Sequence, residues 1–478
     1  MNEVGIDALH FSVPKLTLAI EELAKHRNIE YAKLNKGLGL TEMAVCDIDE
    51  DAATLAAEAV YQLITTFNIS PEEVGRLYMG TESAVDSAKP TATYTLEMLQ
   101  EKLGKETDLS HMDVVDMTFA CIGGIDAFQN AMDWVRAQPS RKAIVVAADN
   151  AKYELGSSGE YTQGAGAVAV LITSNPRLVA FDGEFGVSTQ SAGDFFKPRR
   201  VWEKSALLKQ AAEILGVSLS EEQLHEKLEN SNEGFWSTQN KFIQQYTECP
   251  VFDGPYSNEC YQNRIIEALD RFSDSTSKQP SNWDKLIFHL PYAFQGRRMF
   301  TPIFIDWYKQ MGKLGEVAEA IGEEIPETDE IPMDIVKKVS KTTLYKDFVH
   351  DRIRQGEVAS SVIGNMYTAS IFMALLSLLK TAEEEQEELN DKKIGFFAYG
   401  SGSKAKAFEG TVQPQWKEQL TGIDLFNALK ARTSIDFETY EQIHREERST
   451  PVAQAQHFKF ESIENNDQMP GYRLYKTL

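Results

Sequence analysis

Residues 113–149 have the sequence DVVDMTFACIGGIDAFQNAMDWVRAQPSRKAIVVAAD, and this stretch decides the fold class. The apolar run at 113–119 predicts a strand, the periodicity over 122–135 predicts a helix, and the run at 142–149 predicts another strand. A helix between two strands is the usual crossover of a parallel pair. The stretch therefore predicts an α/β protein.

The same alternation extends toward the N-terminus. Residues 4–14 and 76–80 are predicted strands, and residues 49–67 and 93–103 are predicted helices. Strands and helices alternating at this spacing are typical of a sheet with helices on both faces. We therefore expect residues 1–175 to form one α/β half of the protein.

A second alternation occurs late in the chain. KLIFHL at 285–290 and KIGFFAY at 393–399 predict strands, and the apolar periodicity at 364–380 predicts a long helix. We expect residues 176–478 to form a second α/β half of similar design, which suggests an internal duplication.

Two polar stretches interrupt this second half. Residues 201–249 include the helix start LSEEQ at Ser220, and residues 309–356 also have helical character. We interpret both stretches as surface excursions rather than as additional catalytic domains.

The composition excludes several classes of function. The 478 residues include 48 Lys and Arg against 72 Asp and Glu, a net charge of −24. Binding to nucleic acid or to an anionic membrane needs positive surface charge, so neither partner is expected. Hydrophobic residues make up 42% of the chain, which is enough for a large packed core.

The sequence also predicts a cytoplasmic protein without a metal site. The N-terminus lacks a basic start followed by an apolar block, and the longest apolar stretch, 371–379, is too short to span a bilayer. The four cysteines contain no CxxC pair and are too few for a disulfide framework. A single reactive thiol remains possible.

Cys121 is the candidate for that thiol. It lies between a predicted strand and a predicted helix, at a helix N-terminus where unpaired backbone amides lower a thiol pKa and stabilise a developing oxyanion. Gly123 and Gly124 leave space for a substrate. The alternative is a small buried core residue, because free cysteines are often buried.

Glu82 and His289 also follow predicted strands, in GTESAVDSAK and FHLPY. A carboxylate beside apolar residues suits proton abstraction. Taken singly, Glu82 is better explained as a helix-capping or loop carboxylate, and His289 as a core residue. The argument rests on recurrence, because strand ends gather in one crevice of an α/β sheet.

Arg297 and Arg298 follow His289 in GRRMF. In an acidic chain, paired arginines beside a candidate catalytic residue are suited to phosphate binding. A salt-bridged surface is the alternative. The segment YGSGS at 399–403 follows a strand and suggests a backbone amide for an oxyanion.

Eight motifs, in this order, resemble the hydroxymethylglutaryl-CoA synthase family: GTESAVDSAK, FACIGG, YTQGAGAVAV, GDFFKP, DGPYSNECY, FHLPY, GNMYTAS and FAYGSGS. The resemblance implies a thiolase-like fold, a layered αβαβα core built from two similar βαβαβ halves. It also implies a homodimer that condenses acetyl-CoA with acetoacetyl-CoA in the mevalonate route of isoprenoid synthesis. Neither a metal nor a redox cofactor is expected, since the CoA thioesters carry the acyl groups.

The resemblance also implies site residues. Cys121 matches the nucleophile, Glu82 the general base, and His289 the residue that polarises the acetoacetyl group. Further motif positions match substrate-binding residues: Asn365, Ser401, Tyr153 and Asp194, beside the arginines Arg297 and Arg298.

Three alternatives stay open. A polyketide β-branching synthase uses the same three residues but takes its substrates from acyl-carrier proteins. A ketoacyl synthase or thiolase shares the fold, but the Glu82 motif weighs against it. A catalytically silent scaffold requires the loss of one of the three residues, and all three are present.

Overall fold

A computed structural model describes residues 3–104, 106–231, 236, 240–326, 331–466 and 468–478. The chain divides into two compact units, residues 1–194 with 253–478 and residues 195–252. Parts of both predicted excursions, residues 232–235, 237–239 and 327–330, lie outside the described residues.

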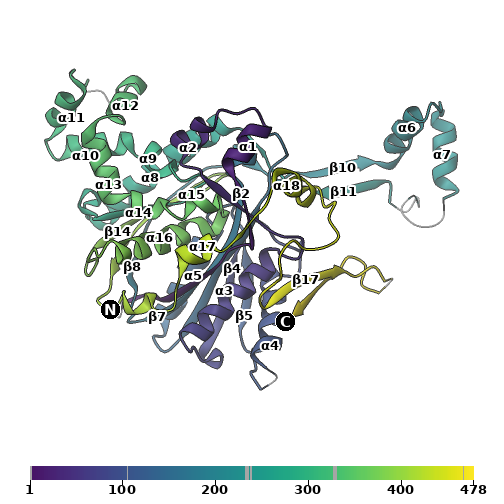
Figure 1. The fold of residues 1–478 in the computed structure, drawn as a ribbon, viewed down its shortest axis with the longest axis horizontal. Coiled ribbons are helices and arrows are strands. Elements are labelled where there is room, and N and C mark those ends of the chain that lie inside the picture. The colour runs from purple at the N-terminus through teal and green to yellow at the C-terminus, as the bar shows by residue number, and fades with distance from the viewer. Residues whose placement is uncertain (1–2, 105, 232–235, 237–239, 327–330, 467) are drawn as a thin grey trace. The chain divides into compact units, whose positions relative to one another are not determined.

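Five strands of the large sheet come from the N-terminal part of the chain (Figure 1). They are β1 (Val4–Ser12), β4 (Val74–Gly80), β5 (Asp113–Met117), β6 (Lys142–Ala151) and β7 (Gly164–Ser174). Their order in the sheet is β1-β7-β6-β4-β5. β4 runs parallel to β5 and β6, whereas β7 runs antiparallel to both of its neighbours.

Four later strands repeat this arrangement. They are β8 (Val179–Thr189), β13 (Lys285–Phe288), β14 (Lys393–Gly400) and β15 (Lys404–Val412), in the order β8-β15-β14-β13. β15 is antiparallel to both neighbours, as β7 is, and β13 and β14 are parallel. β1 pairs with β8, so the described strands form one nine-stranded sheet. The repeat supports an internal duplication, and the boundary near residue 175 stays a prediction.

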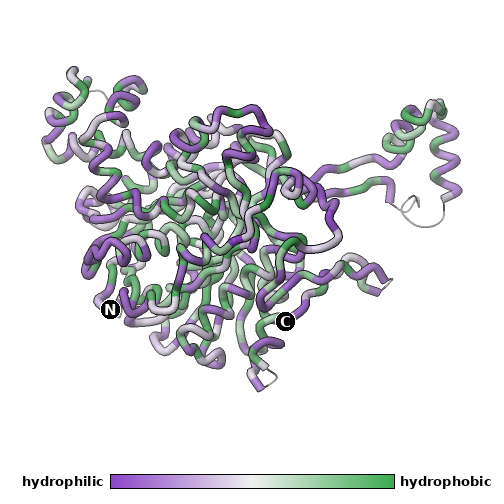
Figure 2. The backbone as a smooth tube through the Cα atoms, viewed as in Figure 1, coloured by the Kyte–Doolittle hydropathy of each residue, from purple (hydrophilic) through white to green (hydrophobic). Residues whose placement is uncertain are grey.

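Helices cover the strands in layers. Side chains on a strand alternate between its two faces. Along β7, Val168 and Val170 pack in one core cluster with helix α5 (Gly123–Ala137), and Ala167 and Ala169 pack in another with α3 (Ala52–Thr66). The predicted α/β fold with helices on both faces is confirmed. Figure 2 shows hydrophobic residues alternating with hydrophilic ones along this unit.

Further helices complete the layers. α4 (Thr91–Leu103) contributes to the cluster of α3, and α16 (Ser370–Glu384) to the cluster of α5. The rings of Phe128 in α5 and Phe372 in α16 lie 5.9 Å apart. α8 (Gly254–Thr276) packs on β8, where a Cβ at Gly186 would lie 2.0 Å from the Ala268 carbonyl oxygen. Among the described residues, no helix is long and apolar enough to cross a bilayer.

The helix expected at 364–380 begins later than predicted. α16 starts at Ser370, after a 3-10 turn at Tyr367–Ala369. Gly364 has φ of 86° and Tyr367 has φ of 42°, and this left-handed backbone does not fit a right-handed helix. The predicted start at Gly364 is therefore wrong, and residues 364–369 form a turn instead.

Residues 309–356 are more buried than expected. They form α11 (Leu314–Ile321), α12 (Met333–Val339), α13 (Thr343–Arg352) and most of α14 (Arg354–Glu357), after α9 (Gln295–Met299) and α10 (Thr301–Gln310). Their buried side chains include Val317, Val339 and Tyr345. Tyr345 packs on Phe304, with ring centroids 5.0 Å apart. The expectation of a surface excursion is wrong here, because these helices extend the core.

Smaller elements surround this core. A three-stranded sheet contains β2 (Leu16–Ala19), β3 (Glu42–Val45) and β16 (Thr433–Ser434), and a C-terminal hairpin contains β17 (Phe458–Ile463) and β18 (Arg473–Thr477). The remaining α-helices of this unit are α1 (Ile20–His26), α2 (Tyr31–Leu38), α15 (Ser360–Ile363), α17 (Leu425–Lys430) and α18 (Phe437–His444).

The second unit combines strands with helices. β10 (Arg199–Glu203) pairs with β11 (Phe242–Tyr246), and β9 (Phe195–Phe196) pairs with β12 (Val251–Phe252). α6 (Lys204–Ile214) and α7 (Glu221–Glu229) follow β10 along the chain. Ser220 caps α7, which confirms the predicted helix start. The stretch is not purely helical, however, because it also contains strands.

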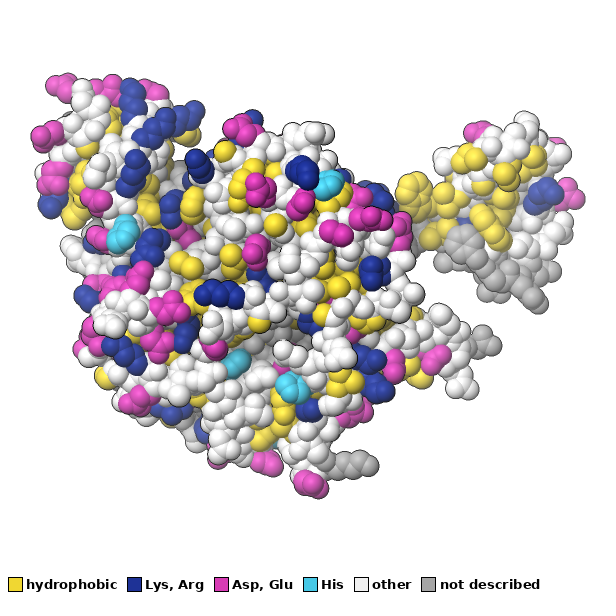
Figure 3. Space-filling model, viewed as in Figure 1, with side chains coloured by type: hydrophobic (Ala, Val, Ile, Leu, Met, Phe, Trp, Pro, Cys, Tyr) yellow, Lys and Arg dark blue, Asp and Glu magenta, His cyan; other side chains and the backbone are white. Residues whose placement is uncertain are grey.

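This second unit exposes many apolar side chains. Among its hydrophobic residues, Ala212 and Leu224 are buried. Figure 3 shows hydrophobic side chains on its surface, and the exposed ones include Trp202, Ile214 and Leu215. So large an apolar surface is unusual for a small unit.

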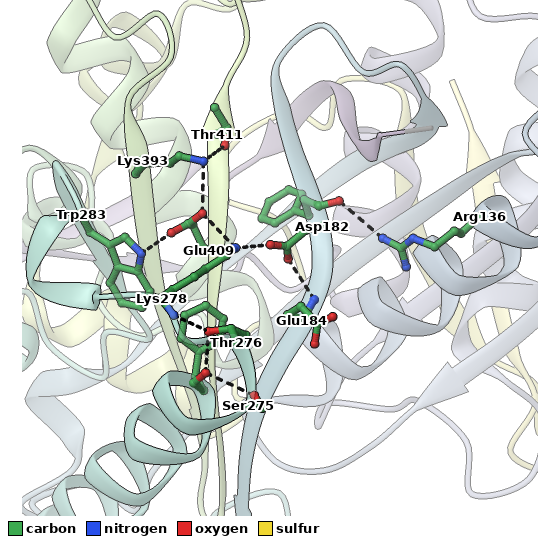
Figure 4. A network of polar contacts seen from close by, with 12 residues as sticks. Arg136, Asp182, Glu184, Ser275, Thr276, Lys278, Trp283, Lys393, Glu409 and Thr411 are labelled. Carbon is green, nitrogen blue, oxygen red and sulfur yellow. Dashed lines mark hydrogen bonds and ion pairs between the residues drawn. The ribbon is translucent and has the colours of Figure 1, made fainter. Parts of the chain in front are cut away.

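A polar network connects the strands of the C-terminal half (Figure 4). The Glu409 carboxylate in β15 accepts hydrogen bonds from Trp283 Nε1 at 2.7 Å, Lys278 Nζ at 3.1 Å and Lys393 Nζ at 3.2 Å. Burial alone would raise the pKa of Glu409, but these donors lower it. The carboxylate is therefore charged, and it links β14 and β15 to the segment after α8.

Candidate active site

The ends of β4 and β5 bring Glu82 and Cys121 together. The two strands are parallel neighbours, with Gly80 opposite Met117, so the segments that follow them leave the sheet at the same edge. The Cys121 thiol donates a hydrogen bond to Glu82 Oε1 over 3.1 Å. Cys121 is buried, with 8% of its surface exposed. Two of the three predicted catalytic side chains are therefore in direct contact.

Glycine is required where these two strand ends meet. A Cβ at Gly80 would lie 2.3 Å from the Gly124 Cα, and one at Gly123 would lie 2.5 Å from the Met117 carbonyl oxygen. These distances are shorter than any tolerated contact between such atoms. The first turn of α5 can therefore approach the end of β4 only without side chains at these positions.

The backbone around Cys121 differs from the expectation in one respect. Cys121 precedes Ile122, the N-cap residue of α5. The amide of Ile122 donates to the Phe119 carbonyl at 3.1 Å, and that of Gly123 donates to the Ala120 carbonyl at 3.3 Å. The prediction of unpaired amides beside the thiol is therefore wrong for these two residues, because the turn uses them before the helix begins.

Asp149 fixes the segment that carries Glu82. It is fully buried in β6, and its carboxylate accepts hydrogen bonds from the Glu82 amide at 2.8 Å, the Thr81 hydroxyl at 3.0 Å and the Thr368 amide at 2.9 Å. Burial raises the pKa of Asp149, and the hydrogen bonds from Thr368 and Glu82 oppose this effect. Asp149 was not among the predicted site residues, although it ends the apolar run at 142–149.

Two buried tyrosines lie close to Cys121 and Glu82. The ring centroids of Tyr153 and Tyr367 are 6.4 Å apart. Burial raises the pKa of both hydroxyls, and the negative charges of Cys121 and Glu82 raise it further. Both hydroxyls therefore stay protonated at neutral pH. Tyr153 was a predicted site residue, whereas Tyr367 was missed even though it belongs to the GNMYTAS motif.

Asn365 lies in the turn that contains Tyr367. Its backbone amide donates to the Thr162 carbonyl at 2.9 Å. Its side-chain Oδ1 accepts hydrogen bonds from the Tyr367 amide at 2.8 Å and the Ser370 hydroxyl at 3.2 Å. The structure thus places Asn365 beside an active-site tyrosine, and its contact with a substrate stays a prediction.

The loop after β14 approaches residues 119–123, the turn that contains Cys121 (the Cys121 turn), from the C-terminal half. A Cβ at Gly400 would lie 2.7 Å from the Phe119 carbonyl oxygen and 2.9 Å from the Ile122 amide nitrogen. Residues 400–403, which include Ser401, therefore begin directly against the Cys121 turn. The role of Ser401 in binding an acyl group stays a prediction.

Asp194 supports this loop. It is fully buried, and its carboxylate accepts hydrogen bonds from the Gly402 amide at 2.8 Å, the Tyr399 hydroxyl at 2.8 Å and the Ser257 hydroxyl at 3.3 Å. The Gly402 amide is thus bound to Asp194 and does not serve an oxyanion in this arrangement. The structure favours a supporting role for Asp194, and direct substrate binding stays a prediction.

His289 directly follows β13, and the neighbouring parallel strand β14 leads into the loop of residues 400–403. Its amide donates to the Phe397 carbonyl at 2.9 Å, and its carbonyl accepts a hydrogen bond from the Tyr261 hydroxyl at 3.0 Å. Burial raises the pKa of Tyr261, and the charge of nearby Cys121 contributes to this rise. Tyr261, which the sequence analysis missed, therefore neighbours both His289 and Cys121.

The His289 imidazole is neutral. It is 2% exposed, and burial lowers its pKa to about 3. Within the described part of the chain, its Nδ1 has no hydrogen-bond partner. A neutral imidazole still carries one N–H group, so it can donate a hydrogen bond to a carbonyl oxygen but carries no positive charge at pH 7.

This burial predicts an acid-sensitive fold. In the unfolded chain His289 has a pKa near 6.5, whereas the folded value is about 3. The unfolded state therefore binds the proton first, and stability falls by up to about 1.4 kcal/mol for each pH unit below 6.5. We expect His289→Asn to show a shallower loss of unfolding free energy between pH 7 and 4.5, measured by urea titration. His350→Asn, at an exposed histidine, should keep the original slope, and equal slopes in both variants would contradict the prediction.

The two arginines that follow His289 have different surroundings in the structure. Arg297 Nε donates to Glu357 Oε1 at 2.8 Å, and its guanidinium lies 3.8 Å from the centre of the Phe294 ring. Arg298 is exposed and lies 5.6 Å from the centre of the Tyr292 ring. Among the described residues, no carboxylate lies within ion-pair distance of Arg298. Phosphate binding stays a prediction for both, and Arg298 is the more accessible.

Comparisons with known families identify the protein class. Residues 1–177 match the N-terminal hydroxymethylglutaryl-coenzyme A synthase model, and residues 243–471 match the C-terminal model. The chain belongs to the hydroxymethylglutaryl-CoA synthase family. A hydroxymethylglutaryl-CoA synthase from Haloferax volcanii is 30% identical to it, over 93% of this chain and 92% of its own. The predicted family membership and the acyltransferase class are confirmed.

Solved structures of this synthase family have the same fold. MvaS in complex with 3-hydroxy-3-methylglutaryl coenzyme A superposes with a TM-score of 0.76 and 26% identity, covering 100% of this chain and 99% of MvaS. The HMG synthase of the curacin pathway, in complex with an apo donor acyl-carrier protein, gives a TM-score of 0.73 at 19% identity with full coverage of both chains. The thiolase-like fold prediction is therefore confirmed. At 19% identity, the curacin enzyme supports the fold alone.

Proposed function

We propose that this chain condenses acetyl-CoA with acetoacetyl-CoA and water to give hydroxymethylglutaryl-CoA and CoA. The observation that carries the proposal is the hydrogen bond of 3.1 Å between the Cys121 thiol and the Glu82 carboxylate. A nucleophile in contact with a base is the arrangement that acyl transfer requires. The family membership and the H. volcanii relative support the same reaction.

In the first step, Cys121 takes the acetyl group. The thiol proton moves to Glu82, the sulfur attacks the acetyl-CoA carbonyl, and the CoA thiolate leaves and takes this proton from Glu82, which restores the carboxylate for the next step. One thioester replaces another, so the exchange is nearly isoenergetic and the methyl protons stay acidic. The protonated hydroxyls of Tyr153 and Tyr367 are hydrogen-bond donors close to the Cys121–Glu82 pair.

In the second step, Glu82 removes a proton from the acetyl methyl group. The group is attached to the sulfur that Glu82 contacts, so the carboxylate is within reach of the methyl carbon. Asp149 holds the Glu82 backbone in place through the hydrogen bond to its amide. The resulting enolate is the carbon nucleophile.

In the third step, the enolate attacks the ketone carbon of acetoacetyl-CoA. The neutral His289 imidazole donates its N–H to the ketone oxygen and stabilises the alkoxide that forms. The proton that Glu82 took from the methyl group then passes to this oxygen, and water hydrolyses the Cys121 thioester, which releases hydroxymethylglutaryl-CoA and restores the thiol. No metal or redox cofactor takes part in this scheme.

Two assays test the proposal. Brief exposure to acetyl-CoA should give one acetyl group per chain on the peptide containing Cys121, detected by mass spectrometry. Subsequent acetoacetyl-CoA should remove the adduct and yield hydroxymethylglutaryl-CoA. Acetoacetyl bound to an acyl-carrier protein should react much more slowly. A chain that reacts only with the carrier-bound group would instead be a polyketide β-branching synthase.

Arg298 offers a test of CoA binding. Arg298→Ala should raise the KM for both CoA substrates about tenfold and change kcat less, because a charge-assisted phosphate contact contributes mainly to binding. Arg297→Ala is the matched control, and it should lower the unfolding midpoint by leaving the buried Glu357 carboxylate without its partner. An unchanged KM in Arg298→Ala would remove this residue from the CoA site.

The proposal includes a homodimer in the cytoplasm, which is the arrangement that the family resemblance implies. Two copies related by a two-fold axis form the commonest kind of oligomer. Sedimentation of the purified chain measures the first point, and fractionation of the producing cells measures the second.

A further inference from the structure

The Asp126 carboxylate is paired with two lysines of β15 and lies beside the Cys121 turn. Asp126, in the first turn of α5, binds Lys404 Nζ at 2.5 Å and Lys406 Nζ at 2.7 Å. The lysine side chains are 15% and 7% exposed, and that of Asp126 is 19% exposed. Lys406 also donates to Gln129 Oε1 at 2.5 Å. The proposed reaction uses none of these groups directly.

These residues join the two halves of the molecule next to the nucleophile. Asp126 follows Cys121 by five residues on the N-terminal side, and Lys404 directly follows the loop of residues 400–403 on the C-terminal side. The Lys404 ammonium lies 4.2 Å from the centre of the Phe119 ring, and Phe119 precedes Cys121 by two residues. A Cβ at Gly402 would lie 4.0 Å from the same ring. One ion pair therefore connects both segments that meet at the thiol.

The cluster is also held in a fixed geometry. The Asp126 amide donates to the Ile122 carbonyl at 3.1 Å, so the carboxylate is tied to the turn after Cys121. Lys404 opposes Thr189 of β8 and Gly400 of β14, so its backbone is part of the sheet. Burial lowers the pKa of Lys406, and the charge of Asp126 opposes this effect.

We propose that Asp126 is a positioning residue that sets the distance between the Cys121 turn and the loop of residues 400–403 through its ion pair with Lys404. The inference rests on the proposed function, because its effect is on acetyl transfer to Cys121. Misplacement of a reacting group by about 1 Å costs on the order of 100-fold in rate. Loss of the pair should therefore slow acetylation more than it weakens binding of acetyl-CoA.

The test compares Asp126→Asn with Glu409→Gln. Both substitutions neutralise a partly buried carboxylate that contacts two lysines, but Glu409 lies in β15 within the network of Figure 4 and contacts no residue of the Cys121 turn among the described residues. The measurements are the rate of acetyl-adduct formation at Cys121, the acetyl-CoA concentration for half-maximal rate, and the urea unfolding midpoint. We expect Asp126→Asn to acetylate 10- to 100-fold more slowly at an unchanged half-maximal concentration, and Glu409→Gln to acetylate within twofold of the wild-type rate.

A further variant tests the inference at the other residue of the ion pair, in case Asp126→Asn fails to fold. Lys404→Met leaves Asp126 paired with Lys406 and removes the contacts of the Lys404 ammonium with Asp126 and the Phe119 ring, and we expect it to slow acetylation in the same way. The inference is wrong if Asp126→Asn and Lys404→Met acetylate at the wild-type rate, or if Glu409→Gln slows as much for the same loss of stability. A wild-type chain that forms no adduct at all would overturn the proposed function, and the inference with it.

Discussion

Cys121→Ala should form no acetyl adduct after exposure to acetyl-CoA, and its turnover should fall by about 10⁶-fold, as expected when a nucleophile is removed. The sulfur is the only atom of this side chain that can form a thioester, and Ala fits the space that it leaves. The substitution removes one sulfur atom from a buried side chain, so the lost packing is small and the fold should persist. Mass spectrometry of the intact chain and a urea titration measure both parts of the prediction.

The control for this result is Cys249→Ala. Cys249 is partly exposed, whereas Cys46, Cys121 and Cys260 are buried, so a non-specific reaction with acetyl-CoA would occur first at Cys249. The control variant should be acetylated on the Cys121 peptide at the wild-type rate. Radiolabelled acetyl retained by Cys121→Ala would refute the assignment of the nucleophile.

The apolar runs of the sequence were sufficient to place Glu82, Cys121 and His289 at strand ends. Strands that are parallel neighbours end at the same edge, and β4 and β5 do bring Glu82 and Cys121 into contact. The same argument applies to Asp149, which was missed because its role depends on contacts with Thr368, 219 residues away. A local pattern indicates which edge a residue reaches, but not which distant partner meets it there.

The errors in the fold have related causes. Apolar periodicity continues from Gly364 into α16, but Tyr367 has a positive φ, and a tyrosine gives no sequence signal for that conformation. Residues 309–356 appear polar because each helix places only a few apolar residues, such as Val339 and Tyr345, against the core. In both regions, the structure is determined by tertiary contacts rather than by the local preferences of the residues.

Arg297 is a charged residue whose partner also could not be predicted from the local sequence. Two adjacent arginines in an acidic chain suggested a phosphate site, but the chain supplies its own carboxylate for one of them. Glu357, 60 residues away, is buried and pairs with Arg297. Burial raises the pKa of Glu357 to about 7, and the Arg297 charge opposes the rise. An internal partner at that distance cannot be read from the GRRMF segment.

Glu82→Ala should separate acetylation from condensation. The adduct on Cys121 should still form, although more slowly, because water can accept the thiol proton that Glu82 accepts at 3.1 Å in the structure. Removal of the methyl proton has no such substitute in a buried site, so condensation should fall by roughly 10²- to 10⁴-fold, the usual contribution of a general base. The measurements are the final amount of adduct and the rate of hydroxymethylglutaryl-CoA formation.

Deuterium exchange isolates the step that Glu82 performs. In heavy water and without acetoacetyl-CoA, the wild-type chain should exchange the methyl protons of its acetyl adduct, whereas Glu82→Ala should not. Glu154→Ala, at an exposed glutamate, should exchange like the wild type. Exchange at the wild-type rate in Glu82→Ala would show that another group removes the proton. The contact between Cys121 and Glu82 would then serve only the first step, in which the carboxylate takes the thiol proton.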